Sequence, residues 1–379
     1  MNPATRSRQE LRVVFAHDWL TGMRGGERVL ELLCQAFPGA PIHTLIHNPA
    51  AVSDLINRRV VRTSWLQRIP GIVRHYRRFL PLFPIAARSL KGPPADLFIS
   101  TSHCVAKGMP VPAGARHMCY CFTPMRYAWV CPDDYFGRHP AVQLLIRPLL
   151  AWLRRWDRTA NARVDFFVAI SRHVRERIQT YYGRESRVVY PPVNTDFWTP
   201  DPEADSRPRP GRDQGGYDLM VSALVPYKRL DVAIRAYARS GFPLRIVGTG
   251  VEFGALRRLA TPNIVFLGWQ PDDRVRQLYR ECRALIFPGE EDFGLVPLEA
   301  QSCGRPVVAL ARGGVLESVR DGVTGLFFKE QTPEALMGAL SRFETAVWNP
   351  AVIRRHAETF SIPSFRKAFE FCIQECLHT

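Results

Sequence analysis

Features that would assign the chain to several common protein classes are missing from its 379 residues. The nine cysteines include no CxxC pair, so we expect reduced thiols and no zinc site. No apolar run reaches transmembrane length, and the residues before the first predicted strand lack the apolar core of a signal peptide, so we expect a cytoplasmic protein. No GxGxxG turn follows that strand, which disfavours a plain NAD-binding domain.

Positive charge is concentrated in one half of the chain. Residues 1–200 hold 28 of the 51 basic residues but only 13 of the 35 acidic ones, so nearly all of the net charge of +16 lies there. Nucleic acid is one possible partner, but zinc-finger spacing, an aromatic RNP pattern and a basic zipper are all absent, and we expect no nucleic acid. An anionic membrane surface is the partner that we expect instead.

Strand-like and helix-like stretches alternate along the first half. Strands are predicted at 11–19, 40–46, 95–101, 117–123, 164–171 and 186–193, with helices at 25–37 and 172–182. This alternation with short loops predicts βαβ units and a parallel sheet. Residues 199–216 are rich in Pro, Gly, Asp and Arg and predict an interdomain linker.

The second half repeats this pattern. Strands are predicted at 217–224, 243–250, 263–268, 283–288, 306–310 and 325–328, with helices at 229–240, 272–282 and 295–303. We therefore expect an α/β protein with two doubly wound, Rossmann-like domains, at 1–198 and 217–360. Residues 361–379 predict a helix that would pack back on the first domain.

Three consecutive acidic residues follow one of the predicted strands. Glu290, Glu291 and Asp292 lie between the strand at 283–288 and the helix at 295–303, which carries Glu299. Loops after parallel strands bind ligands in open α/β sheets, and a helix start suits phosphate or sugar oxygen. Carboxylates accept hydrogen bonds from paired hydroxyl groups. The alternative interpretation is a solvated acidic loop with a helix-capping glutamate.

Three stretches together carry a family resemblance: IFPGEEDFGLVPLEAQSCGRPVVA at 286–309, VPYKRLD at 225–231 and LRIVGTG at 244–250. They resemble the retaining glycosyltransferases of family 4, whose GT-B fold has two Rossmann-like domains facing each other across a cleft. HDWLTGMRGGE at 17–27 and STSHCVAKG at 100–108 are similar to stretches of bacterial mannosyltransferase-type enzymes of polysaccharide and O-antigen assembly. Glu291 and Glu299 match the E-x7-E pattern of this family.

The resemblance implies a donor site for a nucleotide-sugar. Glu291 would contact hydroxyls of the transferred sugar, Glu299 the ribose hydroxyls and Lys228 the phosphates, while residues 266–269 would line the base. For Lys228 the alternative is an ordinary surface lysine at a helix start. For Gly248 and Gly250, at the end of the stretch 243–250, the alternative is a structural turn. The implied donor-binding residues are Gly25, Gly26, Lys228, Arg229, Gly248, Gly250, Glu291, Phe293, Gly294, Leu295 and Glu299.

In the first domain, His103 follows a predicted strand and is the candidate for the active-site histidine of the family. Asp18 and Arg126 also follow strands and are weaker candidates for acceptor or phosphate contact. A structural histidine, and a structural helix start at Gly25 and Gly26, are the alternatives. His103, Lys228 and Glu291 are the catalytic residues that the resemblance implies.

Two positions depart from the family pattern. Ala223 stands where related enzymes have an arginine before the lysine loop, which removes a second phosphate-binding cation and about 2–4 kcal/mol of leaving-group stabilisation if nothing replaces it. Phe122 stands where related enzymes have a histidine. Both departures concern turnover more than fold or ligand class.

The resemblance implies a retaining, metal-independent hexosyltransferase without a cofactor. The expected donor is GDP-mannose, and the expected acceptor is a glycan or a polyprenyl-diphosphate-linked sugar of cell-surface glycan synthesis. A transferase that uses a UDP-sugar, a UDP-sugar 2-epimerase and a nucleotide-sugar-binding protein that has lost turnover are the alternatives. The epimerase would need a pattern of catalytic carboxylates and histidines that we do not find.

Two stretches of the first half mix arginines with large apolar residues. Residues 66–91 and 138–163 have the composition of interfacial helices on anionic lipid. We therefore expect a peripheral protein on the cytoplasmic face of the inner membrane, attached through its first domain. The alternative is that the apolar residues form core and the arginines form a solvated face.

Overall fold

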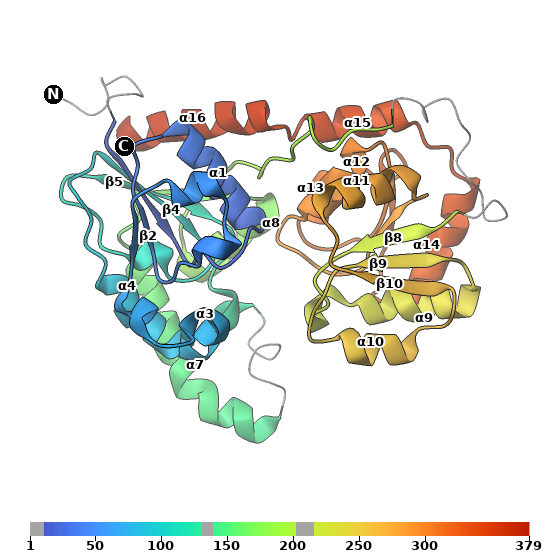
Figure 1. Ribbon diagram of the computed structural model, residues 1–379, viewed down its shortest axis with the longest axis horizontal. Helices are drawn as coiled ribbons and strands as arrows, with labels where there is room; N and C mark the ends of the chain where they lie inside the picture. The colour runs from blue at the N-terminus through green and yellow to red at the C-terminus, as the bar shows by residue number, and fades with distance from the viewer. Residues whose placement is uncertain (1–10, 131–138, 202–215, 379) are drawn as a thin grey trace. The chain divides into compact units, whose positions relative to one another are not determined.

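The structure is a computed structural model that describes residues 11–130, 139–201 and 216–378. The chain divides into two compact units: unit 1, Met1–Pro191 with Arg366–Thr379, and unit 2, Pro192–Phe365. Each unit is built around one parallel sheet (Figure 1). The expected α/β fold with two doubly wound, Rossmann-like domains is confirmed.

Unit 1 contains a seven-stranded sheet in the order β3-β2-β1-β4-β5-β6-β7. Helices cover both faces of such a sheet, which explains why all five residues of β1 are buried and why its sequence is continuously apolar up to His17. The three-residue strand β3, at the edge of the sheet, was not predicted from the sequence. The strands are β1 (Val13–His17), β2 (Ile42–Thr44), β3 (Val61–Thr63), β4 (Leu97–Ser102), β5 (Arg116–Cys121), β6 (Phe166–Ala169) and β7 (Arg187–Val188).

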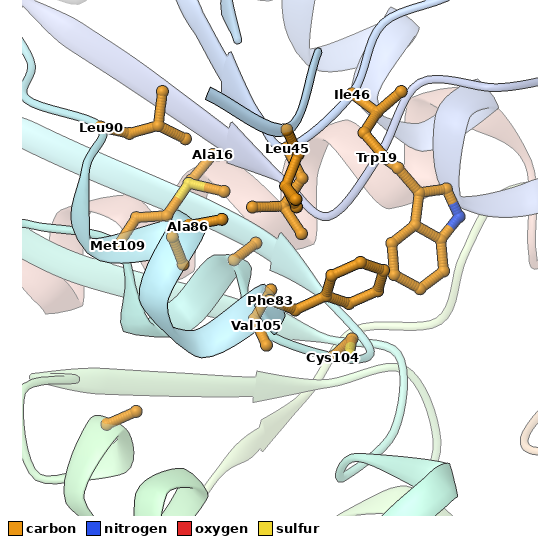
Figure 2. Close-up of a cluster of buried hydrophobic side chains, with 14 of the residues drawn as sticks. Ala16, Trp19, Leu45, Ile46, Phe83, Ala86, Leu90, Cys104, Val105 and Met109 are labelled. Carbon is orange, nitrogen blue, oxygen red and sulfur yellow. The ribbon is translucent and has the colours of Figure 1, made fainter. Parts of the chain in front are cut away.

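The helices of unit 1 form two layers. Helices α1 and α16 lie on one side of the sheet, and α3, α4 and α7 lie on the other (Figure 1). On the second side, Ala16 of β1 packs in a buried apolar cluster with Trp19, Phe83 and Met109 (Figure 2). The helices are α1 (Gly25–Ala36), α2 (Asp54–Asn57), α3 (Ile72–His75), α4 (Phe83–Arg88), α5 (Arg126–Trp129), α7 (Pro140–Asn161), α8 (Arg172–Tyr182) and α16 (Ile362–His378).

Unit 2 contains a six-stranded parallel sheet in the order β10-β9-β8-β11-β12-β13. Helices α9, α10 and α14 cover one face, and α11, α12, α13 and α15 cover the other (Figure 1). The strands are β8 (Asp218–Val221), β9 (Leu244–Val247), β10 (Ile264–Gly268), β11 (Leu285–Phe287), β12 (Val307–Leu310) and β13 (Gly325–Phe328). The helices are α9 (Leu230–Ser240), α10 (Phe253–Leu259), α11 (Asp272–Glu281), α12 (Leu295–Ser302), α13 (Val315–Ser318), α14 (Pro333–Thr345) and α15 (Pro350–Glu358).

The division into units differs from the expected limits at two places. Residues 192–198, which we expected in the first domain, pack in unit 2, because the Trp198 ring lies 5.5 Å from the Tyr279 ring and Arg276 lies over Phe197. At the carboxyl end, α16 returns to unit 1 as expected, but from Arg366 rather than from residue 361, and Phe369 packs 5.6 Å from Tyr120. Most of the expected linker, residues 202–215, lies outside the described residues.

The two arginine-rich stretches differ from the expected interfacial helices. In residues 66–91, the large apolar side chains Ile72, Tyr76, Leu80 and Phe83 belong to the unit 1 core, and the segment forms only short helical turns. In α7, Leu153 and Trp156 are also core, but Leu144 and Leu145 near its start are 66% and 80% exposed. The most exposed apolar side chains of the two stretches therefore lie in the first half of α7, while Ile85 and Trp152 are 56% and 40% exposed. Among the helices that the structure describes, none is long and apolar enough to cross a membrane.

Candidate functional site

Strand order reverses once in each sheet, between β1 and β4 in unit 1 and between β8 and β11 in unit 2. In open parallel sheets, ligands bind at the carboxyl ends of the strands at such a switch point. In unit 1, Asp18 directly follows β1 and His103 directly follows β4. In unit 2, the loop with Lys228 follows β8 and the loop with Glu291 follows β11. These four expected residues therefore lie at the two switch points, whereas Gly248 and Gly250 follow β9 and Arg126 follows β5.

The unit 2 switch point holds an ion pair between the Lys228 ammonium and the Glu291 carboxylate. Both side chains are largely buried, with 15% and 20% of their surface exposed, so each charge is poorly hydrated and depends on the other. The structure thus brings together the residue expected to bind the phosphates and the residue expected to bind the sugar. A ligand that offers an anion to Lys228 and hydroxyl donors to Glu291 replaces this pair without leaving either charge unpaired.

Close backbone contacts fix the acidic loop. Gly289 lies so near Lys228 that a β-carbon there would stand 2.8 Å from the Lys228 carbonyl oxygen. On the other side, the Gly314 amide donates a 2.8 Å hydrogen bond to the Glu291 carbonyl, and a β-carbon at Gly313 would stand 2.4 Å from the same oxygen. These glycines let three loops approach, so Glu291 is held by backbone rather than by its own side chain.

Glu299 lies on α12 and accepts a 3.1 Å hydrogen bond from the Tyr279 hydroxyl. Burial raises the pKa of Tyr279, and the nearby Glu299 charge raises it further, so the phenol stays a donor. This hydrogen bond orients the Glu299 carboxylate. Gly294, with φ of 87°, precedes α12, whose first turn has no side-chain cap, and Phe293 beside it is buried. The start of α12 thus offers backbone N–H groups beside Glu291.

Arg229 and the glycines after β9 have structural partners. Arg229 adopts a left-handed conformation with φ of 51°, and its guanidinium contacts Asp231 at 2.9 Å and Gln331 at 3.0 Å. A β-carbon at Gly248 or Gly250 would stand 1.9 Å or 2.2 Å from a backbone carbonyl of the β8 loop. Close backbone approach is therefore sufficient to explain both glycines, and their place in a nucleotide pocket stays a prediction.

In unit 1, Asp18 does not reach solvent, and this differs from the ligand contact that we expected. Its carboxylate accepts hydrogen bonds from the backbone amides of four consecutive residues, His103 to Ala106, at 2.6–3.0 Å. Burial alone would raise the pKa of Asp18, but the His103 imidazole and these hydrogen bonds hold it far below the usual range. Asp18 is therefore a buried anion that shapes the loop after β4.

His103 is oriented by Asp18 and by Trp19. Its Nδ1 lies 3.0 Å from an Asp18 oxygen, and its ring meets the Trp19 ring edge-on at 4.6 Å. Because Nδ1 donates to the carboxylate, the other nitrogen, Nε2, is the acceptor of the neutral ring. About a third of the side chain is exposed, with 31% of its surface accessible. His103 can therefore accept a proton or a hydroxyl hydrogen bond at Nε2.

Phe122, the start of α1 and Arg126 also follow or adjoin the strands of unit 1 near His103. Phe122 lies 6.5 Å from His103 and 6.4 Å from His17, ring to ring, so it does approach the histidine despite its departure from the family pattern. A β-carbon at Gly26 would stand 3.2 Å from the Phe122 ring, which places the start of α1 here as well. Gly25 begins α1, and Arg126 begins α5 after β5; their expected ligand contacts stay predictions.

Sequence reasoning missed a buried ion pair beside the His103 loop. The Lys107 ammonium lies 2.8 Å from Asp157 of α7, and neither side chain is exposed. Lys107 also donates to the Cys104 carbonyl at 2.8 Å, and Asp157 accepts from Trp129 and Tyr182. Burial would lower the pKa of Lys107, but the Asp157 charge raises it, so the pair stays ionised. A lysine five residues past a strand and an aspartate in an amphipathic helix gave no sequence signal of this contact.

Both halves of the chain match known family models. Residues 23–197 match the model "Glycosyltransferase Family 4", and residues 203–352 match "Glycosyl transferases group 1". A D-inositol 3-phosphate glycosyltransferase of Acidothermus cellulolyticus is 38% identical over 185 residues, 42% of this chain and 41% of its own. A protein of the same description from Rhodococcus erythropolis is 32% identical over 241 residues, 55% and 54% of the two chains. The chain spans about half the length of these curated relatives.

Solved structures agree over nearly the whole chain. Anabaena Alr3699/HepE in complex with UDP and glucose superimposes with a TM-score of 0.68 at 17% identity, covering 96% of this chain and 99% of that one. The lipopolysaccharide outer core galactosyltransferase WaaB in its apo form gives 0.65 at 18% identity, with the same coverage. At these identities the likeness shows the fold, which is GT-B.

The buried Asp18 anion leads to a prediction for stability. In Asp18→Asn the four backbone N–H donors meet a neutral amide, which has only one acceptor oxygen. The substitution should therefore lower the free energy of unfolding of unit 1 by about 3 kcal/mol at neutral pH. His103→Asn keeps all four amide contacts and should cost less than about 1 kcal/mol. Because folding depresses the pKa of Asp18, its contribution is present above the ordinary value of 3.8 and is lost as the pH falls below it.

Urea unfolding of the two variants between pH 7 and pH 3 measures this difference. The difference in the free energy of unfolding between Asp18→Asn and the wild type should become smaller toward pH 3. Equal stability of the two variants at pH 7 would show that His103, rather than the backbone amides, is the partner that matters.

Proposed function

We propose a function on the premise that the chain has the GT-B fold of the glycosyltransferases whose group 1 and family 4 models match its two halves. In this proposal it is a retaining hexosyltransferase, which moves a hexose from a nucleotide-sugar to a hydroxyl group of an acceptor. The observation that carries the proposal is the Lys228–Glu291 ion pair at the switch point of unit 2, beside the uncapped start of α12. In the bond that breaks, Lys228 lies at the diphosphate end and Glu291 at the hexose end.

The donor is assigned to unit 2. Lys228 and the first N–H groups of α12 take the diphosphate, since both are positive and lie at one loop cluster. Glu291 takes hydroxyls of the hexose, and Glu299, steadied by Tyr279, takes the ribose hydroxyls. Trp269, directly after β10, is 73% exposed and offers an aromatic face to the base.

The transfer step needs the leaving diphosphate to be stabilised as its bond to the sugar breaks. The acceptor hydroxyl attacks the anomeric carbon on the face from which the diphosphate leaves, and a phosphate oxygen takes the hydroxyl proton. Lys228 then balances the charge that develops on the diphosphate, a role that a fixed cation fills well in a poorly hydrated site. His103 is assigned to the acceptor side, where Nε2 accepts a hydrogen bond from a hydroxyl group.

Two donors compete within this proposal. We propose GDP-mannose, on the sequence resemblance to mannosyltransferase-type enzymes. UDP-hexoses are the second candidate, because a structure that shares the fold was solved with UDP and glucose. The acceptor is also a proposal: a lipid-linked or polysaccharide glycan on the resemblance, or a phosphorylated polyol on the description of the curated relatives.

A nucleotide-sugar-binding protein without turnover is the alternative that one observation favours. Ala223 stands on the β8 loop where the family pattern has a second cation, and Arg229, the basic residue after Lys228, is engaged with Asp231 and Gln331. Leaving-group stabilisation then depends on Lys228 and α12. Binding of a nucleotide-sugar without hydrolysis or transfer would identify this alternative.

Substitution of the ion pair tests the proposed roles. Lys228→Ala should lower kcat/KM for donor hydrolysis and transfer at least tenfold, mainly in kcat, because the diphosphate charge grows in the transition state. Glu291→Gln should lower it at least tenfold as well, whereas Glu299→Ala should mainly raise KM, since ribose contacts change little during the reaction. Steady-state kinetics with GDP-mannose and UDP-glucose measures both effects.

Lys329→Ala removes an exposed lysine of unit 2 and is the matched control, which should behave as wild type. Kinetics of Lys228→Ala equal to those of this control would refute the phosphate role.

We further propose that unit 1 attaches the protein to the cytoplasmic face of an anionic membrane through α7, mainly through its first half. Leu144 and Leu145 there are exposed, and Arg147 and Arg155 on the same helix are exposed cations. Arg154 and Arg158 instead lie over the Trp129 ring, at 5.4 Å and 5.0 Å, and hold the second half of α7 to unit 1. Exposed leucines beside arginines are typical of a helix that inserts shallowly into anionic lipid.

Liposome flotation tests this attachment. The wild type should float with phosphatidylglycerol vesicles, less at high salt and little with neutral vesicles. Leu144→Ser/Leu145→Ser should lower the partition coefficient at least about tenfold, because burying each leucine contributes roughly 1.5 kcal/mol or more. Val347→Ser, at a 94% exposed site of unit 2, is the control and should float as wild type. Equal flotation of the two variants would contradict a role for α7.

A further inference from the structure

Unit 1 contains a basic cavity whose lining residues have no role in the proposed function. It is open to solvent, has a volume of about 340 Å³ and is lined mainly by polar and charged side chains. No carboxylate contributes to its lining. Its lining includes Thr21, Arg24, Arg74, Tyr76, Arg77 and Arg78.

Two segments distant in sequence build this basic cavity. Thr21 and Arg24 belong to the connection from β1 to α1, and the other residues belong to α3 and to the 3₁₀ turn Tyr76–Leu82 that follows it. Buried Ile72 and Tyr76 pin the second segment to the core, so the arginines between and after them must face outward. Their clustering follows from the fold and is invisible in the separated sequence segments.

The charge of the basic cavity favours an anionic ligand. Four guanidinium groups around a volume of this size repel one another, and an anion among them replaces repulsion by attraction. Arginine matches phosphate in particular, because its planar group donates two parallel hydrogen bonds to two oxygens. The volume lies at the small end of ligand sites and suits a phosphate or diphosphate group with part of its substituent.

The Thr21 hydroxyl gives a second, independent indication of a ligand. Its oxygen is buried, and among the residues that the structure describes none forms a hydrogen bond with it. An unsatisfied buried hydroxyl is costly, and one on the lining of a cavity is satisfied by whatever polar group occupies that cavity. A phosphate oxygen accepts the bond that Thr21 can donate.

The basic cavity lies next to the candidate acceptor histidine. Tyr76, on its lining, packs 5.1 Å from the Trp19 ring, and the Trp19 ring also lies 4.6 Å from the His103 ring. Trp19 itself is fixed by the core, where it lies beside Phe83 (Figure 2). Trp19 therefore contacts both a lining residue of the basic cavity and His103 within unit 1.

We infer that the basic cavity binds a phosphate or diphosphate group carried by the acceptor. The acceptor is then anionic: its phosphate is held by Arg74, Arg78 and Arg24, and its reacting hydroxyl lies at His103. The binding of phosphate stands on the cavity alone, whereas its assignment to an acceptor rests on the proposed transferase function. A soluble phosphorylated polyol and an isoprenoid diphosphate lipid both carry this group.

Calorimetric titration with inorganic pyrophosphate tests the binding. It is done on Lys228→Ala, which removes the other proposed diphosphate site, at physiological salt. Adding Arg74→Ala/Arg78→Ala should weaken pyrophosphate binding at least tenfold, while adding Arg58→Ala, an exposed arginine of unit 1 outside the lining, should leave it unchanged. Both arginines are exposed, and circular dichroism checks that the fold persists. Equal affinity with and without Arg74 and Arg78, or no binding at all, overturns the inference.

Two further titrations of the wild type identify the source of the phosphate. Binding of D-inositol 3-phosphate but not inositol, lost in Arg74→Ala/Arg78→Ala, indicates a soluble acceptor. Binding to vesicles that contain an isoprenoid diphosphate, above that to phosphatidylglycerol vesicles and lost in the same variant, indicates a lipid acceptor. If neither depends on these arginines, the assignment to an acceptor fails. If pyrophosphate binds as expected but the wild type turns over no nucleotide-sugar, the transferase proposal fails and the anion site stands.

Discussion

A parallel sheet whose strand order reverses leaves the carboxyl ends of two adjacent strands open at one edge, because the connecting helices depart to opposite faces. This constraint acts twice in the chain, at β1 and β4 and at β8 and β11. Each time it brings an acidic and a basic group together: Asp18 with His103, and Glu291 with Lys228. The two pairs differ in burial, and this difference separates their roles. Asp18 is inaccessible to solvent and binds the backbone of the loop after β4. Lys228 and Glu291 are partly exposed, so a ligand can replace their contact with each other.

Buried charge also determines how firmly unit 1 holds its histidine. The loop from His103 to Lys107 is bound at one end by the Asp18 carboxylate and at the other by the Lys107–Asp157 pair, which connects it to α7. An uncompensated buried charge costs several kcal/mol, so neither contact can be lost without disturbing the loop. The same α7 exposes Leu144 and Leu145 at its far end. The proposed membrane contact and the proposed acceptor histidine therefore share one structural support.

The sequence predicted the fold and most strand positions, because buried parallel strands are continuous apolar runs and their loops are short. It also predicted that Glu291 and Lys228 act together, through the family pattern. It did not predict that Asp18 is a loop anchor, since four backbone amides leave no mark on side-chain sequence. Nor could it separate core from surface in residues 66–91, where arginines alternate with apolar side chains at helical spacing. The basic cavity depends on that same distinction, because its arginines gather only once Ile72 and Tyr76 are buried.

The central claim is that a nucleotide-sugar binds at the unit 2 switch point. Hydrogen–deuterium exchange of the intact chain, with and without GDP-mannose or UDP-glucose, measures this directly. The account predicts slower exchange of amides in residues 225–230 and 289–296 with at least one of the two donors, because the ligand would accept bonds from the first turn of α12 and order the Lys228 loop. If exchange in both segments stays unchanged with GDP-mannose and also with UDP-glucose, each at a saturating concentration, the claim is contradicted.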